Sequence, residues 1–438
     1  MQALQDTGRY HHLAAINADV WPGIVTIPTG MFAASKARRA EAEFATACEK
    51  AGLDLDGPHP DLRVLYEEIF TRIAYSGWLG LAEGYMAGEW ESDNLVRVLT
   101  GLLEVGYRPR CGKLEVGGLY LGEEIPDSLV RLYSGDGMST HGPVFSSGVP
   151  TTERVYMKSY VPGAGKKDEP GQHFVDITEL SPPTLVERAD LGDAQVRAAV
   201  GLLDSAHVGI GTHVLDFPSS GPTIPIAAAR RSATVDVLSS DAQQVADVQD
   251  VVAMADVDSS VQVRLLESLF PNPRTWPSHY DVITSVEKLE VMDTQAQRVY
   301  AQSLNRMLVH GGFLAIQTVV ATDDKLSVTL DRCADVLRAY IWPALNYLTI
   351  EQLHRLFDVN TDLRIIAQTH MGSHYVEGLA MQRETFEAQS REAAANGYDR
   401  VYRNLWVFQL ALREALFRVG ALDALQLVVT SRYRRAWG

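Results

Sequence analysis

Acidic side chains stand at the ends of short apolar runs in the second half of the chain, where acids can hold a nucleoside-containing cofactor. Asp216 ends the run HVLD, Asp236 lies within TVDVL, and Glu267 follows VQVRLL. If these runs are strands, acids at such positions commonly meet an amino group, ribose hydroxyls or the adenine amine. The alternative remains open for each, because an acid at a strand end is often a helix N-cap or a surface residue.

Other reactive residue types give weaker signals. His11 and His12 are adjacent, and His370 and His374 are four residues apart, but no suitable third ligand stands nearby in the sequence. A catalytic or structural zinc site needs at least three protein ligands, so ordinary polar histidines and no metal are expected. Ser219-Ser220-Gly221 lacks the Gly-x-Ser-x-Gly pattern of a nucleophile elbow.

Strands and helices alternate from about residue 194 to residue 320, which predicts the frame that positions these acids. The runs HVLDF, TVDVL, VQVRLL, YDVITSV and GFLAIQTVV read as strands, with helical segments between most of them. Such alternation is typical of an α/β fold with a doubly wound, mainly parallel sheet. Ligands then bind beyond the carboxyl ends of the strands.

The rest of the chain differs in composition and in predicted secondary structure. Residues 1–105 are helical in character, residues 106–195 form an irregular Gly/Pro-rich insertion, and the α/β pattern opens a third region, 196–438. The final third of the chain, from Asp331 onward, reads as mostly helical. Its longest amphipathic stretch, NLWVFQLALREALFRVGALDALQLVV, starts at Asn404. Its apolar residues are expected in the core first, with a lining role in an acyl-chain tunnel as the alternative.

Composition excludes several functional classes. The 438 residues carry a net charge of −16, with 39 basic and 55 acidic side chains, so a nucleic-acid partner is not expected. Three cysteines fit a reducing cytoplasm better than a disulfide framework, and no run is long enough to span a bilayer. The segment Lys36-Ala37-Arg38-Arg39 is either a solvated face or a contact with lipid headgroups.

Several segments together resemble the cyclopropane-fatty-acid synthase family. GWLGLAEGYMAGEWESDNLVRVL (residues 77–99) is similar to the family's N-terminal signature. YDVITSVEKLEVM (280–292) and HGGFLAIQ (310–317) resemble two strands of the sheet and their ends. Residues 374–389 and 397–432 are similar to the family's C-terminal region. About two thirds of the chain takes part, without the middle insertion.

This resemblance implies a methyltransferase fold, an S-adenosylmethionine cofactor, and methylation of double bonds in phospholipid acyl chains. Glu287 matches the glutamate that holds a bicarbonate ion in the family, and Glu290 matches the second acid of that segment. Tyr375 matches the tyrosine on the far side of the site. Gln317 stands at the family's histidine position, and glutamine cannot act as a base near neutral pH.

The sequence departs from the family after the first strand. Where the family has three glycines, this chain reads Asp216-Phe217-Pro218-Ser219-Ser220-Gly221-Pro222. Ser220 does not readily adopt a turn with φ above zero, and Gly221 replaces one glycine only with a one-residue shift. The family's Tyr-Ser-Cys-type segment corresponds at best to VDITELSPP (residues 175–183), which has no cysteine. We therefore expect S-adenosylmethionine to bind weakly or not at all.

Two functional hypotheses follow. In one, the protein transfers a methyl or methylene group from S-adenosylmethionine to unsaturated phospholipid chains. In the other, it is a pseudoenzyme that binds lipid or serves as a partner subunit of an active relative. Either predicts a cytoplasmic protein with peripheral contact at the inner membrane face, and a homo-oligomer or a complex with a paralogue. Residues 106–195 are predicted to cover the cofactor mouth or meet a second subunit, with the weakly alternating run at 114–122 as a strand.

Overall fold

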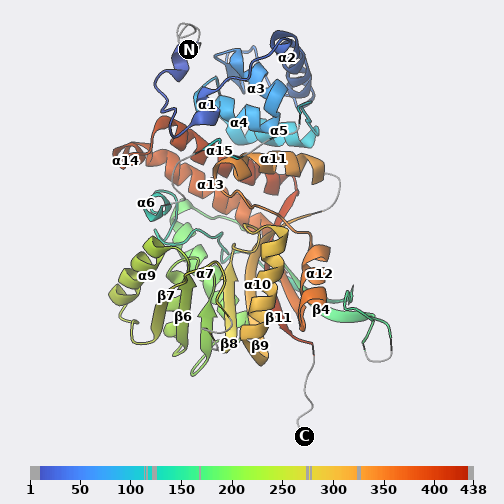
Figure 1. Ribbon diagram of the computed structural model, residues 1–438, viewed down its shortest axis with the longest axis vertical. Coiled ribbons are helices and arrows are strands. Elements are labelled where there is room, and N and C mark those ends of the chain that lie inside the picture. Colours follow the sequence, from blue (N-terminus) through green and yellow to red (C-terminus); the bar gives the residue numbers. More distant parts are fainter. Residues whose placement is uncertain are drawn as a thin grey trace. The chain divides into compact units, whose positions relative to one another are not determined.

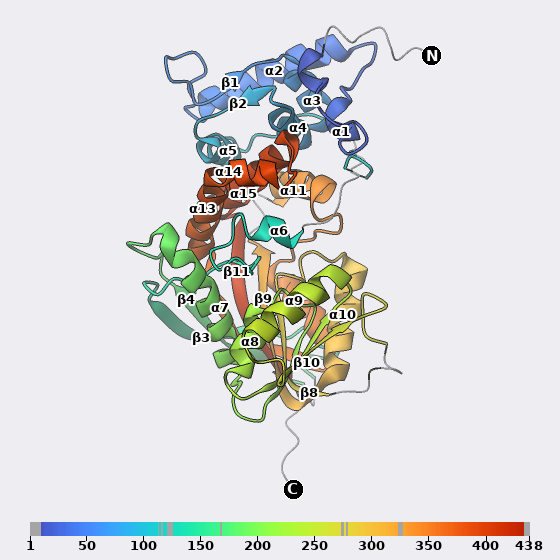
Figure 2. The same ribbon diagram turned by 90° about the vertical axis from the view of Figure 1, so that its left-hand side faces the viewer.

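The computed structural model describes residues 10–112, 114, 117–120, 126–166, 169–272, 276, 279–322 and 327–432. The chain divides into two compact units. One comprises Met1–Leu132, Asp323–Leu345 and Gln382–Ala421, and the other Tyr133–Thr322, Asn346–Met381 and Leu422–Gly438. Their elements are labelled in Figure 1 and appear after a 90° turn in Figure 2.

The first unit is helical apart from a two-stranded ribbon. Its elements are η1 (His11–Leu13), α1 (Pro22–Val25), α2 (Ala33–Lys50), β1 (Arg63–Val64), α3 (Glu68–Ser76), α4 (Trp78–Ala87), β2 (Trp90–Glu91), α5 (Leu95–Glu104), α6 (Asp127–Val130), α11 (Ser327–Tyr340), α14 (Ser390–Ala395) and α15 (Arg400–Arg418). α15 packs against α4 and α5. The ring of Phe408 in α15 lies 5.6 Å from that of Tyr85 in α4.

The second unit holds a nine-stranded sheet with the order β3-β4-β10-β11-β9-β8-β5-β6-β7. The strands are β3 (Pro150–Lys158), β4 (Gln172–Leu180), β5 (His213–Asp216), β6 (Thr234–Ser239), β7 (Val261–Leu265), β8 (Tyr280–Val286), β9 (Leu308–Ala321), β10 (Leu363–His370) and β11 (Leu422–Ser431). The pairs among β9, β8, β5, β6 and β7 are parallel, whereas β11 runs antiparallel to β9 and β10.

Helices cover both faces of this sheet. The helices on the faces are α7 (Leu191–Ser205), α8 (Thr223–Ala229), α9 (Ala242–Met254), α10 (Thr294–Met307) and α12 (Ile350–Asn360). The short η2 (Arg188–Asp190) precedes α7, and the division between the units falls within α13 (Gly372–Ala388). Val214 and the other side chains on its face of the sheet pack with α7, α8 and α9. Leu215 lies on the opposite face and packs with α10 and α12. The alternation follows from the two-residue period of a strand. Each fully buried side chain of this kind stabilises the fold by about 1.5–3 kcal/mol.

The structure confirms the doubly wound α/β sheet and differs from the sequence predictions in two places. The C-terminal amphipathic stretch is not one helix, because α15 ends at Arg418 and β11 begins at Leu422. Gly420 between them has φ +70°, a conformation that ends a helix at little cost. β3 and β4 also lie inside the predicted irregular insertion and extend the main sheet.

The compact units do not follow the predicted boundaries. Residues 323–345 and 382–421 fall with the N-terminal helices, although the sequence placed them in the region 196–438. The reason is packing, since α11 and α15 bury their apolar faces against α4. Of the predicted strand at 114–122, residues 114 and 117–120 are described and none of them is in a strand, whereas the other residues lie outside the described ranges. Across the described ranges, no helix combines the length and the apolar character needed to cross a membrane.

Candidate functional site

The site lies at the carboxyl ends of β5 and β8, two adjacent parallel strands in the middle of the sheet. β5 ends at Asp216, and Glu287 follows the last residue of β8. From β5 the chain proceeds to β6 on one side, whereas β8 and β9 lie on the other. Loops diverge at such a switch point and leave space for a ligand.

Three N–H groups of the loop after β5, residues 217–222, donate hydrogen bonds within the protein. The N–H groups of Phe217 and Ser219 donate to carbonyl oxygens of β8 and β6 at 3.0 and 2.9 Å. The N–H of Gly221 donates to Oγ of Ser219 at 3.3 Å. Pro218 and Pro222 have no N–H to offer. Little of this main chain is therefore left to bind a ligand by the close backbone approach that a glycine-rich turn allows.

Asp216 is fully buried below this loop. Its Oδ1 accepts a hydrogen bond of 2.9 Å from the Thr284 hydroxyl, and its Oδ2 meets no hydrogen-bond donor among the described residues. Burial raises the pKa of Asp216 to about 7, although Thr284, Ser219 and the charge of Lys288 oppose that rise. The carboxyl is thus balanced between its neutral and charged forms near neutral pH.

A stretch that we call the covering segment, residues 134–142, packs on this loop. The Ser139 hydroxyl lies 2.7 Å from that of Thr223, the first residue of α8. Gly221 has φ +125°, and a Cβ there would stand 3.1 Å from the Met138 carbonyl oxygen. Ser220 is 4% exposed. Residues 134–142, a part of the segment 106–195, therefore lie over this loop.

Two polar side chains fix the covering segment. Asp136 accepts hydrogen bonds from the N–H groups of Met138 and Ser139 at 2.9 and 2.7 Å. Burial by itself raises the pKa of Asp136. These hydrogen bonds and the one from the Ser139 hydroxyl outweigh burial, so the pKa of Asp136 lies below its ordinary value. Gln195 of α7 accepts from the Gly135 N–H at 3.0 Å and donates to the His141 carbonyl at 3.0 Å.

The three residues predicted to be catalytic lie together, and we call them the carboxylate cluster: Glu287, Gln317 and Tyr375. The Tyr375 hydroxyl donates to Oε1 of Glu287, and the Gly142 N–H donates to the same oxygen at 2.8 Å. Nε2 of Gln317 donates to the Tyr375 hydroxyl oxygen at 2.7 Å. Its Oε1 accepts from Gln426 of β11 at 2.9 Å. The cluster is a closed network in which the groups satisfy one another.

Backbone conformation at Glu287 is unusual for a residue with a side chain. Its φ is +51°, in the left-handed region, and its N–H donates to the Gln317 carbonyl at 2.8 Å. A non-glycine residue held there costs free energy, and such residues gather at functional sites. The conformation places the carboxylate against Tyr375 and Gly142.

Gly142 is required by close packing. A Cβ at this position would lie 2.3 Å from Cζ of Tyr375. Burial and the neighbouring charge of Glu287 raise the pKa of Tyr375 well above its ordinary value, so the phenol keeps its proton and remains a donor. Sequence reasoning missed Gly142, because it lies in the Gly/Pro-rich stretch that indicated only a loop.

Two charged neighbours follow Glu287. Burial, then the charge of Glu287, raises the pKa of Glu290 to about 7. Its carboxylate accepts hydrogen bonds from the Thr318 hydroxyl at 2.7 Å and the Val319 N–H at 3.0 Å, which ties the turn to β9. Burial lowers the pKa of Lys288, and the charges of Asp216 and Glu287 oppose that fall.

The other two predicted cofactor ligands are not brought to the loop. Asp236 accepts a hydrogen bond from the Tyr280 hydroxyl at 2.8 Å and faces His213 at 3.5 Å. Both partners begin their strands, so this carboxylate points toward the amino ends. Glu267 is exposed beyond β7. The acid at the carboxyl end of β6 is instead Asp241, which caps α9 through the N–H groups of its first turn.

The predicted counterpart of the family's Tyr-Ser-Cys-type segment also lies elsewhere. Residues 175–180 belong to β4, which pairs with β10. The main chain that meets Glu287 comes from the covering segment. The covering segment includes the run Met138-Ser139-Thr140-His141-Gly142. Only the hydroxyl and imidazole side chains of this run indicated a functional site in the sequence.

The pair His370 and His374, singled out in the sequence, has protein partners. His370 lies 2.7 Å from Asp423, and Nδ1 of His374 accepts from the Phe145 N–H at 2.9 Å. Within the described part of the chain, no three His, Cys, Asp or Glu residues are grouped to hold a metal ion.

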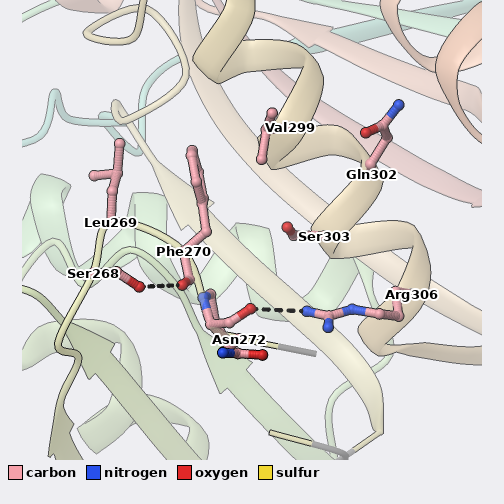
Figure 3. A pocket seen from close by; sticks show the side chains of 9 residues that line it. Ser268, Leu269, Phe270, Asn272, Val299, Gln302, Ser303 and Arg306 are labelled. Atoms are coloured by element: carbon pink, nitrogen blue, oxygen red, sulfur yellow. Dashed lines mark hydrogen bonds between the residues drawn. The ribbon is translucent and has the colours of Figure 1, made fainter. Parts of the chain in front are cut away.

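A pocket of about 690 Å³ lies away from this site, between the chain after β7 and α10 (Figure 3). Arg306 points across it and donates to the Pro271 carbonyl at 3.2 Å. A smaller pocket of about 180 Å³ in the helical unit has Cys111 and Arg332 in its wall. Neither pocket is lined by the carboxylate cluster.

The strand order, with β11 antiparallel among parallel neighbours, defines a Rossmann-like methyltransferase fold. Residues 185–427 match the family of mycolic acid cyclopropane synthetases, to which this chain belongs. It is 27% identical to the tuberculostearic acid methyltransferase UfaA1 of Mycobacterium tuberculosis strain H37Rv, over 94% of this chain and 96% of that protein.

Shorter or more distant similarities complete the comparison. A cyclopropane-fatty-acyl-phospholipid synthase of Escherichia coli strain K12 is 40% identical over 58 residues, which are 13% of this chain and 15% of that protein. The solved cyclopropane synthase MmaA2 of Mycobacterium tuberculosis is similar at a TM-score of 0.49 and 22% identity, over 55% of this chain and 85% of that one.

Proposed function

We propose that this protein binds unsaturated acyl chains of phospholipids and that its methyl transfer from S-adenosylmethionine is weak or lost. It then serves as a lipid-binding protein or as a partner subunit of an active relative. The observation that carries the proposal is the loop after β5, whose N–H groups at Phe217, Ser219 and Gly221 already donate within the protein. The covering segment also lies on Gly221 through the Met138 carbonyl.

The amino-acid part of S-adenosylmethionine carries a carboxylate, which needs donors. A glycine-rich turn supplies them from its main chain, and this loop has two prolines and internally bonded neighbours. At the end of β6, Asp241 accepts from the N–H groups of Gln243 and Gln244. These residues therefore fit the cofactor poorly.

Bicarbonate meets a similar difficulty. The donors that an oxyanion would need at Glu287 are the Gly142 N–H, the Tyr375 hydroxyl and the Gln317 amide. The first two donate to Glu287 and the third to Tyr375. A bicarbonate ion could enter only if this network opened, so its presence remains part of the alternative function.

Peripheral contact with the inner membrane face is supported by the start of α2. Met31 and Phe32 are 91% and 65% exposed, and Lys36, Arg38 and Arg39 follow them on exposed positions. Apolar side chains beside basic ones suit the boundary between acyl chains and anionic headgroups. A cytoplasmic location is part of the same proposal.

Calorimetric titration of the intact protein with S-adenosylmethionine and S-adenosylhomocysteine tests the cofactor half. We expect dissociation constants weaker than about 100 μM. Binding in the low micromolar range would overturn the proposal. Mass spectrometry of lipids extracted from the purified protein tests the lipid half, with an unrelated protein from the same host as the control. Absence of phospholipid or acyl chains above that control would contradict lipid binding.

The alternative function is active transfer of a methyl or methylene group to phospholipid acyl chains. Two observations favour it: the carboxylate cluster is assembled, and Oδ2 of Asp216 is buried without a donor, as a ligand's amino group would require. Incubation with radiolabelled S-adenosylmethionine and vesicles of unsaturated phospholipid decides between them. Label in the lipid that disappears in Glu287→Gln would establish the alternative.

A further inference from the structure

The outer edge of β3 is an unpartnered strand edge of unusual length. β3 lies at the end of the nine-stranded sheet, and no other described strand pairs with its outer side. Its residues are exposed or half-buried throughout. Tyr156 on β3 and Phe174 on β4, whose ring centroids lie 4.1 Å apart at an interplanar angle of 35°, are 63% and 51% exposed. Open edges of this kind pair with other strands unless they are protected.

Hydrogen bonds at both ends of the hairpin show which groups of β3 face outward. The Ser159 N–H donates to the Gly171 carbonyl, and the Val149 carbonyl accepts from the Ser181 N–H. Odd-numbered residues of β3 therefore direct their main-chain groups toward β4. Because these groups alternate along a strand, the even-numbered residues 152, 154, 156 and 158 direct theirs away from the sheet.

We propose that β3 pairs antiparallel with β3 of a second copy of this chain, with Val155 on the two-fold axis. Arg154 then exchanges main-chain hydrogen bonds with Tyr156 of the second copy, and Thr152 does so with Lys158. Every outward-facing group involved belongs to an even-numbered residue, as the hairpin geometry requires. The interface is isologous, so each copy offers the same edge.

Charge selects this register over its neighbours. A register centred on Glu153 would place two carboxylates opposite each other, and one centred on Arg154 would do the same with two guanidinium groups. Like charges directly opposite each other destabilise a strand pair. With Val155 on the axis, Arg154 instead lies beside the Tyr156 ring of the second copy, which suits a cation-π contact. Arg154 is also paired with Asp176 on its own β4 at 2.6 Å.

The proposal concerns association and does not depend on whether the protein transfers methyl groups. Residues directly opposite each other in a non-hydrogen-bonded antiparallel pair have Cα atoms about 4.5 Å apart, close enough for a disulfide. Single cysteine variants Glu153→Cys, Val155→Cys and Met157→Cys, made in a Cys111→Ser background, therefore report the register. Cys48 and Cys333 are buried and remain in place.

We expect Val155→Cys to form a cross-linked dimer on mild oxidation, at least about fivefold more than the two matched controls on the same strand face. Light scattering after size exclusion at about 100 μM should show a dimer for the unaltered protein. Val155→Glu and Val155→Lys should each be monomeric and should form a dimer when mixed. Stronger cross-linking at position 153 or 157 would overturn the register. A monomer under all conditions, without cross-linking, would overturn the proposal.

Discussion

The loop after β5 and the carboxylate cluster occupy the same edge of the same sheet, yet they relate differently to the family. The cluster keeps the acid and the phenol of the resemblance and has the amide of Gln317 at the family's histidine position, and the structure joins all three through hydrogen bonds. The loop keeps its acid, Asp216, and replaces the glycines around it. One part of this sheet edge therefore matches the resemblance, while the other part departs from it in sequence.

The first and largest test of this comparison is the pH dependence of stability at Asp216. Its pKa is raised from 3.8 to about 7, so the folded state holds this proton more tightly than the unfolded state. Stability from this residue is thus present below pH 3.8 and is lost as the pH rises toward 7. Asp216→Asn removes the ionisation and should raise the unfolding free energy at pH 8 by up to about 4 kcal/mol relative to its effect at pH 4.

Urea unfolding at a series of pH values measures this effect. Glu267→Gln alters an exposed acid at the same sheet edge and serves as the matched control, with the wild-type slope expected. Glu290 titrates in a similar range and contributes its own slope to every variant, so the informative quantity is the difference between Asp216→Asn and wild type. Parallel profiles for these two proteins would contradict the burial argument.

A second prediction addresses the cluster through Gly142→Ala. The added methyl group would lie 2.3 Å from the Tyr375 ring, so either the ring or the covering segment must move. We expect a loss of about 1–3 kcal/mol in unfolding free energy. Gly209→Ala, where no atom lies within 4 Å of the new Cβ, is the control. Equal stability of the two variants would mean that the covering segment does not pack as described.

Much of this fold could be predicted from the sequence, because β5 to β9 carry strong local signals. Their apolar runs alternate with helices whose caps are explicit, such as Asp241 before α9. β11 could not be predicted in the same way. Its apolar residues follow those of α15 in one continuous apolar stretch, which the sequence divides only at Gly420. Periodicity is ambiguous in short apolar runs, and tertiary pairing with β9 and β10 decides the outcome.

The candidate site likewise has residues whose places could be predicted from the sequence and residues whose places could not. The proximity of Glu287, Gln317 and Tyr375 could be predicted because the resemblance matched the segments that carry them, which are the end of β8, the interior of β9 and the first turn of α13. Gly142 could not, since its role depends on a main-chain N–H and on space beside a ring, which leave no trace in residue type. Asp236 lies within β6, as the sequence predicts, but its carboxylate meets Tyr280 and His213 at the starts of β8 and β5, which residue type alone does not reveal.

A third prediction removes one oxygen from the cluster. Tyr375→Phe deletes the hydroxyl that donates to Glu287 and accepts from Gln317, so the buried Gln317 and the half-buried Glu287 each lose a hydrogen-bond partner. We expect a loss of about 1–2 kcal/mol in unfolding free energy, measured by urea titration. Tyr300→Phe, which deletes a hydroxyl donating to the Phe217 carbonyl, is a matched control on the loop side. A double variant with Gln317→Leu should lose less than the sum of its parts if the network is coupled.

The smallest expected effect belongs to the loop itself. Pro218→Gly with Ser220→Gly restores conformational freedom, and we expect calorimetry to show S-adenosylmethionine binding tightened by less than about tenfold. The reason is that glycine does not release the Ser219 N–H from β6 or remove the Met138 carbonyl from Gly221. Circular dichroism of the double variant would show whether it remains folded. Low-micromolar binding by a folded double variant would show that two side chains alone had closed the site, and the loop and the cluster would then be halves of one intact pocket.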